Sequence, residues 1–174
     1  MPQLLLCLSL ILTLPAQTPA PPKGPDRDAI LQASRTIIAG AHYATLVTVD
    51  GASQPDARIV DPFAPESDFT IWLATKAASR KVTELRKDPR VTLLYFDAAT
   101  KGYVTVKGTA RLVNDPAMKA KYWKNEWNGM YANKNQGDDY LLVQVTPDTL
   151  EVVSVALGMM NDSVTWKPVT ITIK

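Results

Sequence analysis

Residues 69–96, FTIWLATKAASRKVTELRKDPRVTLLYF, hold the pattern from which the rest of the fold is worked out. Apolar segments rich in β-branched and aromatic residues stand at both ends, and an amphipathic stretch lies between them. This order predicts a strand, a short turn, a helix over residues 79–87 and a second strand. The helix is expected to stop before Pro89, because the residue that precedes a proline disfavours the helical conformation.

The turn before this helix gathers polar side chains of two kinds. It carries two hydroxyls and two cations, Thr75, Ser79, Arg80 and Lys81. The first N–H groups of a helix lack intrahelical partners, and the helix dipole favours an anion at that end. The pattern therefore indicates a site for a phosphate monoester, such as the tail of flavin mononucleotide (FMN). An ordinary helix start with an exposed basic pair has the same spacing, and this alternative stays open.

The first residues are expected to be an export signal. The chain has 174 residues, and residues 4–14 are an almost unbroken apolar run followed by small residues and prolines. This fits a signal peptide over residues 1–20, cleaved after Ala16 or Ala20, because such a run is too short to span a bilayer. Residues 21–25 then form a Pro-rich tether, and residues 26–174 the folded domain. We expect a secreted or periplasmic protein, with a retained N-terminal anchor as the alternative because no Lys or Arg precedes the run.

Composition excludes several classes of function. The one cysteine, Cys7, lies in the expected leader, so the mature chain has no thiol for a disulfide, a nucleophile or a thiolate metal site. With a single histidine besides, no metal site is expected. The formal net charge is +2, from 19 cations and 17 anions, which gives no case for nucleic-acid binding.

Further segments alternate between strand and helix signals. A helix is expected over residues 26–39, with Asp26 as N-cap and Gly40 as its stop, and another helix opens at residues 114–116. Strands are expected at residues 43–49, 57–60, 69–74, 91–96, 102–113, 140–145 and 149–155, with one more within 164–173. These elements predict a mainly β fold, a closed or partly closed antiparallel β-barrel with helices packed outside.

The order of these motifs resembles a known superfamily. A D-G hairpin, an A-R-I-V strand, the turn T-x-x-x-S-R-K, a helix ending in D-P-R-V and the strand Y-V-T-V-K-G-T-A-R-L-V are similar to those of FMN-binding split-barrel proteins. Within that superfamily the chain resembles short pyridoxamine 5′-phosphate oxidase-like proteins of the general stress protein 26 type. The likeness runs from about residue 26 to residue 153.

The resemblance implies a cofactor, a site and a partner. It places Thr75, Ser79, Arg80 and Lys81 at the FMN phosphate. It places Arg58, Ile59 and Val60 on the strand that lies along the flavin, and Tyr103 where a side chain of the second subunit reaches it. It also implies a homodimer with two FMN sites at the interface.

Departures from the family pattern argue against a true pyridoxamine 5′-phosphate oxidase. Phe63 stands where the oxidases carry a lysine that contacts cofactor and substrate, and their C-terminal extension has no counterpart. The strand at residues 149–155 also lacks the tryptophan that short family members often carry.

Two further features have an ordinary structural interpretation beside a functional one. His42 can face a cofactor or ligate haem, but packing at the junction of the first helix and strand is the preferred interpretation. Trp123, Trp127 and Tyr131 would share one face of a continuous helix and cover a flavin. Packing in the core or at a dimer interface is the preferred interpretation for them as well.

We therefore expect an exported FMN-binding flavoprotein with oxidoreductase activity on a small molecule. No side chain stands out as a general acid or base, so no catalytic residue is named. A non-catalytic stress-related or ligand-binding protein on the same fold is the alternative, as is F420 or haem in the same cleft.

Overall fold

The computed structural model describes residues 24–173. The expected signal peptide, residues 1–20, lies outside the described residues, as do residues 21–23 of the expected tether. No helix within residues 24–173 is long and apolar enough to cross a membrane.

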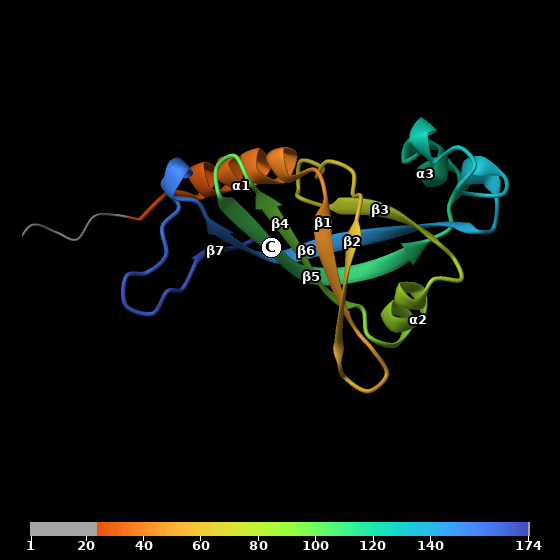
Figure 1. Ribbon diagram of the computed structural model, residues 1–174, viewed down its shortest axis with the longest axis horizontal. Coiled ribbons are helices and arrows are strands. Elements are labelled where there is room, and N and C mark those ends of the chain that lie inside the picture. The colour runs from red at the N-terminus through yellow and green to blue at the C-terminus, as the bar shows by residue number, and fades with distance from the viewer. Residues whose placement is uncertain (1–23, 174) are drawn as a thin grey trace, which may run out of the picture.

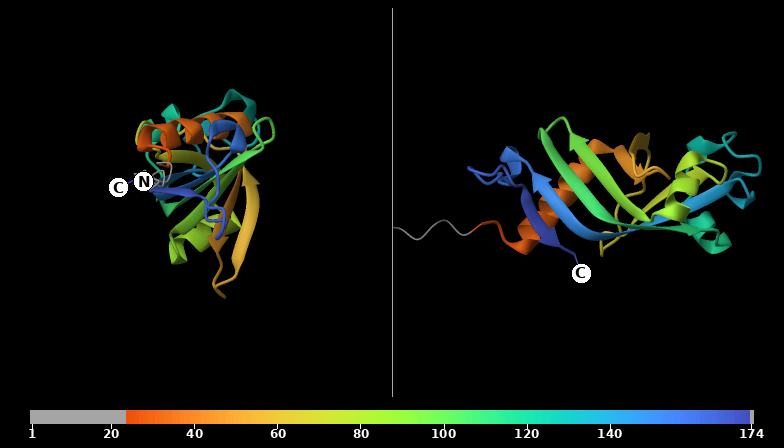
Figure 2. Two further views of the ribbon diagram at one scale, coloured as in Figure 1. Left: turned by 90° about the vertical axis from the view of Figure 1, so that its left-hand side faces the viewer. Right: turned by 90° about the horizontal axis from the view of Figure 1, so that it is seen from below.

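One strongly curled antiparallel sheet forms the body of the protein (Figures 1 and 2). Its strands lie in the order β2-β1-β4-β5-β6-β3, and β7 pairs with β6 beside this path. Their bounds are β1 Ala44–Val49, β2 Pro55–Val60, β3 Ile71–Lys76, β4 Arg90–Asp97, β5 Gly102–Val113, β6 Tyr140–Val153 and β7 Val169–Thr172. An isolated bridge between Pro62 and Leu73 connects the chain after β2 to β3, so the sheet closes partly on itself. The expected partly closed antiparallel barrel is confirmed.

Helices pack against both faces of the curled sheet (Figures 1 and 2). They are α1 Arg27–Ala41, α2 Arg80–Lys87 and α3 Pro116–Lys121, with short 3-10 turns at Asn125–Trp127, Lys134–Gln136 and Val155–Leu157. Helices α1 and α2 lie on the inner face and α3 on the other, so the expectation that the helices pack outside holds only for α3. The side chain of Asp26 accepts a hydrogen bond from the Ala29 N–H, as expected of an N-cap. Gly40 does not stop α1 as expected, because it lies inside the helix, and the end comes at His42 with a positive φ of 61°.

The two clusters of buried side chains lie on opposite faces of the sheet. The larger cluster fills the space between α1 and the inner face, where Ile37, Leu46, Leu73, Leu93 and Val104 have no exposed surface. The smaller cluster is aromatic and lies where α3 meets β3 and β6, with Trp72 and Tyr122 stacked at 4.7 Å between ring centroids.

The C-terminal half differs from expectation in three places. The strands expected at residues 140–145 and 149–155 form one strand, β6, since Pro147 sits opposite Gly108 at a register shift and not at a break. The last strand is limited to Val169–Thr172. The helix that opens at Pro116 ends at Lys121, so Trp123, Trp127 and Tyr131 do not share a continuous helix.

Candidate functional site

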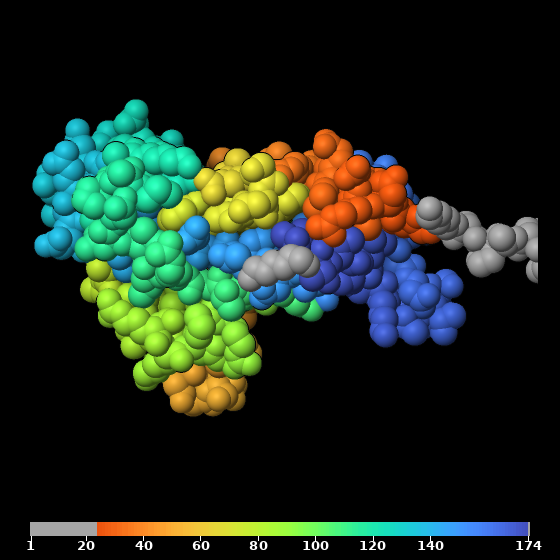
Figure 3. All heavy atoms as spheres, turned by 180° about the vertical axis from the view of Figure 1, so that it is seen from behind, coloured from red at the N-terminus to blue at the C-terminus, as the bar shows by residue number. Residues whose placement is uncertain are grey.

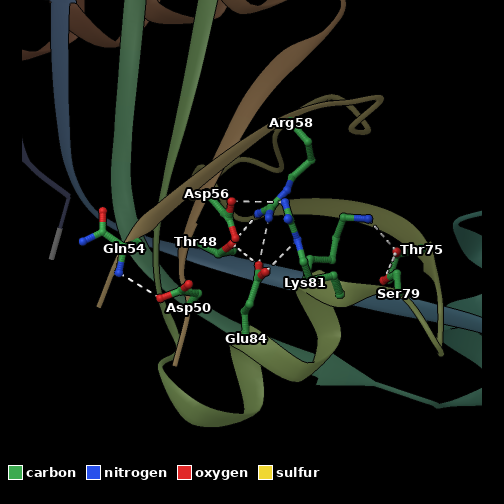
Figure 4. A network of polar contacts seen from close by, with 10 residues as sticks. Thr48, Asp50, Gln54, Asp56, Arg58, Thr75, Ser79, Lys81 and Glu84 are labelled. Carbon is green, nitrogen blue, oxygen red and sulfur yellow. Dashed lines mark hydrogen bonds and ion pairs between the residues drawn. The ribbon is translucent and has the colours of Figure 1, made fainter. Parts of the chain in front are cut away.

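Three of the expected phosphate contacts meet at the start of α2 (Figure 4). The Thr75 and Ser79 hydroxyl oxygens are 2.9 Å apart, and the Lys81 ammonium donates to the Thr75 hydroxyl at 3.0 Å. Ser79 is the N-cap, but its side chain makes no capping hydrogen bond to the helix. The cap hydroxyl bonds Thr75 instead, and among residues 24–173 no side chain accepts from the N–H groups of Arg80 and Lys81, while the Val82 N–H donates to the Ser79 carbonyl at 3.0 Å. Two hydroxyls, a cation and the first amides of a helix in one place fit a phosphate group.

Lys81 is the cation most available to an anion. Its ammonium group forms no ion pair with a carboxylate in the part of the chain that the structure describes, and Thr75 is its hydrogen-bond partner. Partial burial lowers the pKa of Lys81, and the positive charge of Arg58 lowers it further. A phosphate would relieve both unfavourable effects by pairing with the ammonium.

Arg58 lies on the inner face of β2 and is held by the helix opposite. Its Nη2 is 2.8 Å from Oε2 of Glu84 on α2, and its Nη1 donates to the Thr48 hydroxyl of β1. The Thr48 hydroxyl in turn donates to the same Glu84 oxygen. Figure 4 shows these three side chains converging between β1, β2 and α2. The arrangement fixes the guanidinium of Arg58 close to the start of α2.

Arg80 is engaged by two carboxylates. Its Nε is 3.0 Å from Oε1 of Glu84, one turn further along α2, and its Nη2 is 3.2 Å from the Asp56 carboxylate of β2. The contact with Glu84 is an ion pair outside hydrogen-bonding geometry, and the Arg80 side chain is 65% exposed. Arg80 therefore lies at the rim of the site. Its contact with a phosphate remains a prediction, because that contact requires the guanidinium to exchange a carboxylate for the ligand.

Glu84 is the charge that holds this cluster together. Burial raises the pKa of its carboxyl, but the Thr48 hydrogen bond and the charges of Arg58 and Arg80 outweigh burial, so the pKa is lowered overall. A buried carboxylate is retained only where such partners compensate the loss of water. Glu84 thus stays ionised and shares its charge between both arginines.

Ile59 and Tyr103 lie on the outer face of the sheet. Ile59 is opposite Thr45, Thr45 is opposite Leu94, and Tyr103 is opposite Phe96, so the register places these side chains on one surface. Ile59 is 68% exposed and Phe96 59%. Strands β1 and β4 separate β2 from β5, so Ile59 and Tyr103 of one protomer are roughly 14 Å apart across the strands at about 4.8 Å per strand, and Tyr103 is also displaced by two residues along β5. Tyr103 therefore does not contact Ile59 of its own chain.

The other residues that the sequence singled out lie away from the start of α2. Val60 packs against the inner core and does not share the surface of Ile59. His42 is exposed at the end of α1, edge-on to Tyr43 with ring centroids 4.7 Å apart. Trp123, Trp127 and Tyr131 lie close together although they share no helix. The ring centroid of Trp123 is 6.0 Å from that of Trp127 and 6.0 Å from that of Tyr131, and all three belong to the aromatic cluster. Among residues 24–173 no group of His, Cys, Asp and Glu could hold a metal ion.

Thr48, Asp56 and Glu84 belong to the site but were not identified from the sequence. Glu84 follows Arg80 by four residues, a spacing that favours an ion pair on a helix and could have signalled it. Thr48 and Asp56 gave no signal, because only the register of β1 with β2 sets them beside each other.

Sequence comparison gives the family. The family model for pyridoxamine 5′-phosphate oxidase matches residues 30–154, which is most of the chain. This chain belongs to the pyridoxamine 5′-phosphate oxidase family. The match spans the strands and the α2 turn that carry the candidate site. No curated protein matches the chain significantly.

Solved structures with this fold include proteins with different described ligands. General stress protein 26 from Bacillus anthracis is 27% identical with a TM-score of 0.62, over 70% of this chain and 92% of that one. A pyridoxamine 5′-phosphate oxidase-related, FMN binding protein from Nostoc punctiforme is 14% identical (TM-score 0.56), over 88% and 99% of the two chains. A haem binding protein from Mycobacterium smegmatis is 16% identical (TM-score 0.62), over 86% and 59%. At 14% and 16% identity, the last two comparisons support the fold alone. That fold is the split barrel that the sequence predicted.

Proposed function

We propose that this protein binds FMN non-covalently through the start of α2 and acts as an oxidoreductase on a small molecule. The observation that carries the proposal is the meeting of Thr75, Ser79 and Lys81 at the start of α2, where the N-cap side chain does not bond to the helix. Membership of the pyridoxamine 5′-phosphate oxidase family supports it further. Bound FMN would supply the redox chemistry, and the protein would supply position and electrostatics.

The side chains around the phosphate would differ in how readily they bind it, because some of them are already paired with carboxylates. Lys81 and the two hydroxyls contribute charge-assisted and neutral hydrogen bonds without leaving any carboxylate unpaired. Arg58 stands beside them, fixed by Thr48 and Glu84. Arg80 contributes a forked contact only after it leaves Asp56 or Glu84.

The ring would lie along β2, the edge strand of the sheet, where the Ile59 side chain is exposed. Tyr103 lies on the same face of the sheet as Ile59, three strands away from it. A second copy of the chain, packed on the exposed apolar side chains of Ile59, Leu94 and Phe96, would cover that surface and bring its own Tyr103 to the ring. We therefore propose a homodimer with the flavin at the interface, since an apolar patch of this kind is usually covered by a partner.

Export is proposed from the sequence of residues 1–20 alone. Mass spectrometry of the protein recovered from cells and medium would give the mature N-terminus. A mass that begins after Ala16 or Ala20 supports export, whereas a full-length mass in the soluble cell fraction contradicts it.

The phosphate assignment is tested by comparing FMN with riboflavin, which lacks the phosphate. We expect the purified protein to bind FMN much more tightly than riboflavin in a fluorescence titration. Lys81→Met should remove most of that difference, since hydrogen bonds to charged groups contribute about 1.5–3 kcal/mol each. Lys87→Met, at the other end of α2, is the matched control and should keep it. Equal affinity for FMN and riboflavin in the wild type would refute the site.

A binding protein without turnover remains the second candidate. The observation that favours it is the engagement of both arginines by Asp56 and Glu84, which lowers the positive charge offered to a dianion. The absorbance spectrum of the purified protein separates a flavoprotein from a protein that is empty of flavin. A flavin spectrum supports the first, a colourless protein that takes up no FMN supports the second, and an F420 or haem spectrum replaces FMN with that group.

A further inference from the structure

An apolar loop projects from the sheet just before β7. In this loop, residues 160–168, Val164 is 85% exposed and Trp166 75%, and Met160 is exposed as well. It is the blue segment that hangs below the sheet beside β7, and it stands out from the body of the molecule (Figures 1 and 3). Single exposed apolar residues are ordinary, but three on one short loop indicate a contact with another molecule.

Hydrogen bonds within the loop hold it in shape. The Asp162 N–H donates to the Lys167 carbonyl at 2.8 Å, and the Trp166 N–H donates to the Asp162 carbonyl at 3.0 Å. The Asp162 carboxylate accepts from the N–H groups of Val164 at 3.1 Å and Thr165 at 2.7 Å. Trp166 has a positive φ of 57°, which is uncommon for a bulky residue. Such strain is usually retained where it serves a function, and here it accompanies an exposed indole.

The loop continues the outer face of the sheet. Phe96, Tyr103 and Val153 are paired in a row across β4, β5 and β6. A bridge between Ser154 and Met159 then turns the chain back, so the loop starts at the end of this row. The loop therefore extends the surface on which the homodimer is proposed.

The other end of the same face carries a shallow hollow. Its volume is about 200 Å³, and Val47, Val49 and Thr92 are among its walls. Val47 is opposite Thr92 and two residues from Thr45, which is opposite Ile59. Because successive side chains of a strand alternate between faces, the hollow lies on the face that exposes Ile59.

The hollow suits one large uncharged side chain. Its volume is below the range of about 300–1,000 Å³ that small-molecule pockets occupy. Arg90, the charged residue in its walls, is already ion-paired with Asp88. An aromatic side chain can bury about 150–250 Å² in such a place. An indole on the surface of another copy is therefore a suitable occupant.

The positions of loop and hollow allow a second copy to fill both. On β4 the hollow lies at Thr92, two residues before Leu94, and the row that leads to the loop begins at Phe96, two residues after it. A two-fold axis that passes close to Leu94 would exchange the two ends and set each loop against the hollow of the other copy. The interface would then be self-complementary, as two-fold interfaces are.

We propose that the loop at residues 160–168 is a dimerisation arm whose Trp166 lies in the hollow at Val47, Val49 and Thr92 of the second copy. The inference rests on the homodimer of the proposed function but not on the flavin. A bilayer surface also accepts exposed tryptophans, but it would leave the hollow on the same face unfilled.

Disulfide trapping tests the contact, because Cys7 is the one cysteine of the chain. In a Cys7→Ser background, Val164→Cys and Thr92→Cys are prepared as separate proteins, which keeps Trp166 in place. After subunit exchange and mild oxidation, the mixture should give a covalent dimer that neither protein gives alone. Val164→Cys mixed with Gln32→Cys, on the exposed side of α1, is the matched control and should give none.

Light scattering over a range of concentrations tests the tryptophan itself. Trp166→Ser should raise the dissociation constant of the dimer roughly thirtyfold or more, because the contact occurs twice and tryptophans are frequent among the residues that dominate interface affinity. Its urea midpoint should match the wild type, since the side chain is exposed. Met130→Ser removes another exposed apolar side chain, at the α3 end, and should leave the dimer unchanged.

Each negative result has a distinct meaning. Absence of the disulfide, or an unchanged dimer affinity in Trp166→Ser, would overturn the arm and leave the proposed homodimer intact. A monomeric wild type would overturn both. A wild type that sediments with phosphatidylcholine vesicles, when Trp166→Ser does not, would assign the loop to a lipid surface and overturn the arm. FMN uptake by the same variants reports on the α2 site separately.

Discussion

Arg58 of β2 and Glu84 of α2 are joined by an ion pair of 2.8 Å that is shielded from water, the two side chains being 17% and 5% exposed. Thr48 bonds to both partners and so links β1 to the pair. The pair fastens α2 to the sheet at the point where the candidate phosphate contacts gather. One carboxylate therefore affects the stability of the helix and the charge of the site together.

Replacing Glu84 by Gln should destabilise the protein. The amide keeps a hydrogen-bond acceptor for Thr48 but leaves Arg58 buried without its counter-ion, and breaking a buried pair from one side costs about 3 kcal/mol. Urea unfolding followed by circular dichroism would measure the loss. Glu151→Gln, in the more exposed pair with Lys107, is the control and should cost about 0–1 kcal/mol. Equal effects of the two substitutions would mean that Glu84 does not stabilise the docking of α2.

The contribution of Glu84 should depend on pH in one direction. Its pKa in the folded protein is lowered from the ordinary value of 4.5. The stabilisation is therefore fully present above pH 4.5, the value in the unfolded chain, and is lost as the pH falls through the lower folded value. The difference in unfolding free energy between wild type and Glu84→Gln should be constant near neutral pH and shrink below that value. A difference that grows on acidification would contradict the ionised state of Glu84.

The same Glu84→Gln substitution should tighten FMN binding while it weakens the fold. It removes one negative charge beside Arg58 and Arg80, and with it the repulsion between that carboxylate and a bound phosphate. Titration of the folded variant with FMN at low and high salt would show the gain, which should shrink with salt. Riboflavin affinity is the control and should not change. Weaker FMN binding would instead mean that Glu84 acts chiefly by positioning the two guanidinium groups.

The sequence predicted the parts of the fold that short-range patterns encode. Asp26 caps α1, the D-G turn joins β1 to β2, and Pro116 opens α3, each from residues adjacent in the chain. Gly40 shows the limit of such rules. A Cβ at that position would lie 2.8 Å from the Asp97 carboxylate, so the glycine is needed for the close approach of α1 to β4, not as a stop.

Local sequence patterns could not predict contacts between side chains that are far apart in the sequence. Thr75, Ser79 and Lys81 were predicted because they lie on one turn of the chain. The pairing of Arg58 with Glu84 depends on how α2 docks against β1, which no spacing encodes. The hydroxyl of Tyr95, which is buried without a hydrogen-bond partner among residues 24–173, was hidden for the same reason, since strand alternation predicts that the side chain points inward but not that its hydroxyl lacks an acceptor.

The proposed dimer predicts that a charge on the outer face of the sheet separates the protomers. Phe96→Glu places a carboxylate among the exposed side chains of Ile59 and Leu94, where burial against a second copy would cost several kcal/mol. Light scattering after size exclusion should report a dimer for the wild type and a monomer for the variant. Gln32→Glu, on the exposed side of α1, should remain dimeric. A monomeric wild type, or a Phe96→Glu variant that stays dimeric, would rule out this face as the interface.

The register shift between β5 and β6 should tolerate no side chain at Gly108. A Cβ there would lie 2.1 Å from the Thr146 carbonyl oxygen and 2.9 Å from the Cα of Pro147, both backbone atoms that have no rotamer to change. Relief requires the register shift beside Gly108 to move, and with it the pairing of the two longest strands. Gly108→Ala should therefore cost about 3 kcal/mol, at the upper end for overpacked sites, measured by urea unfolding. Gly24→Ala, where nothing lies within 4 Å, should leave the midpoint unchanged, and an equally small effect at Gly108 would show that the bulge is free to relax.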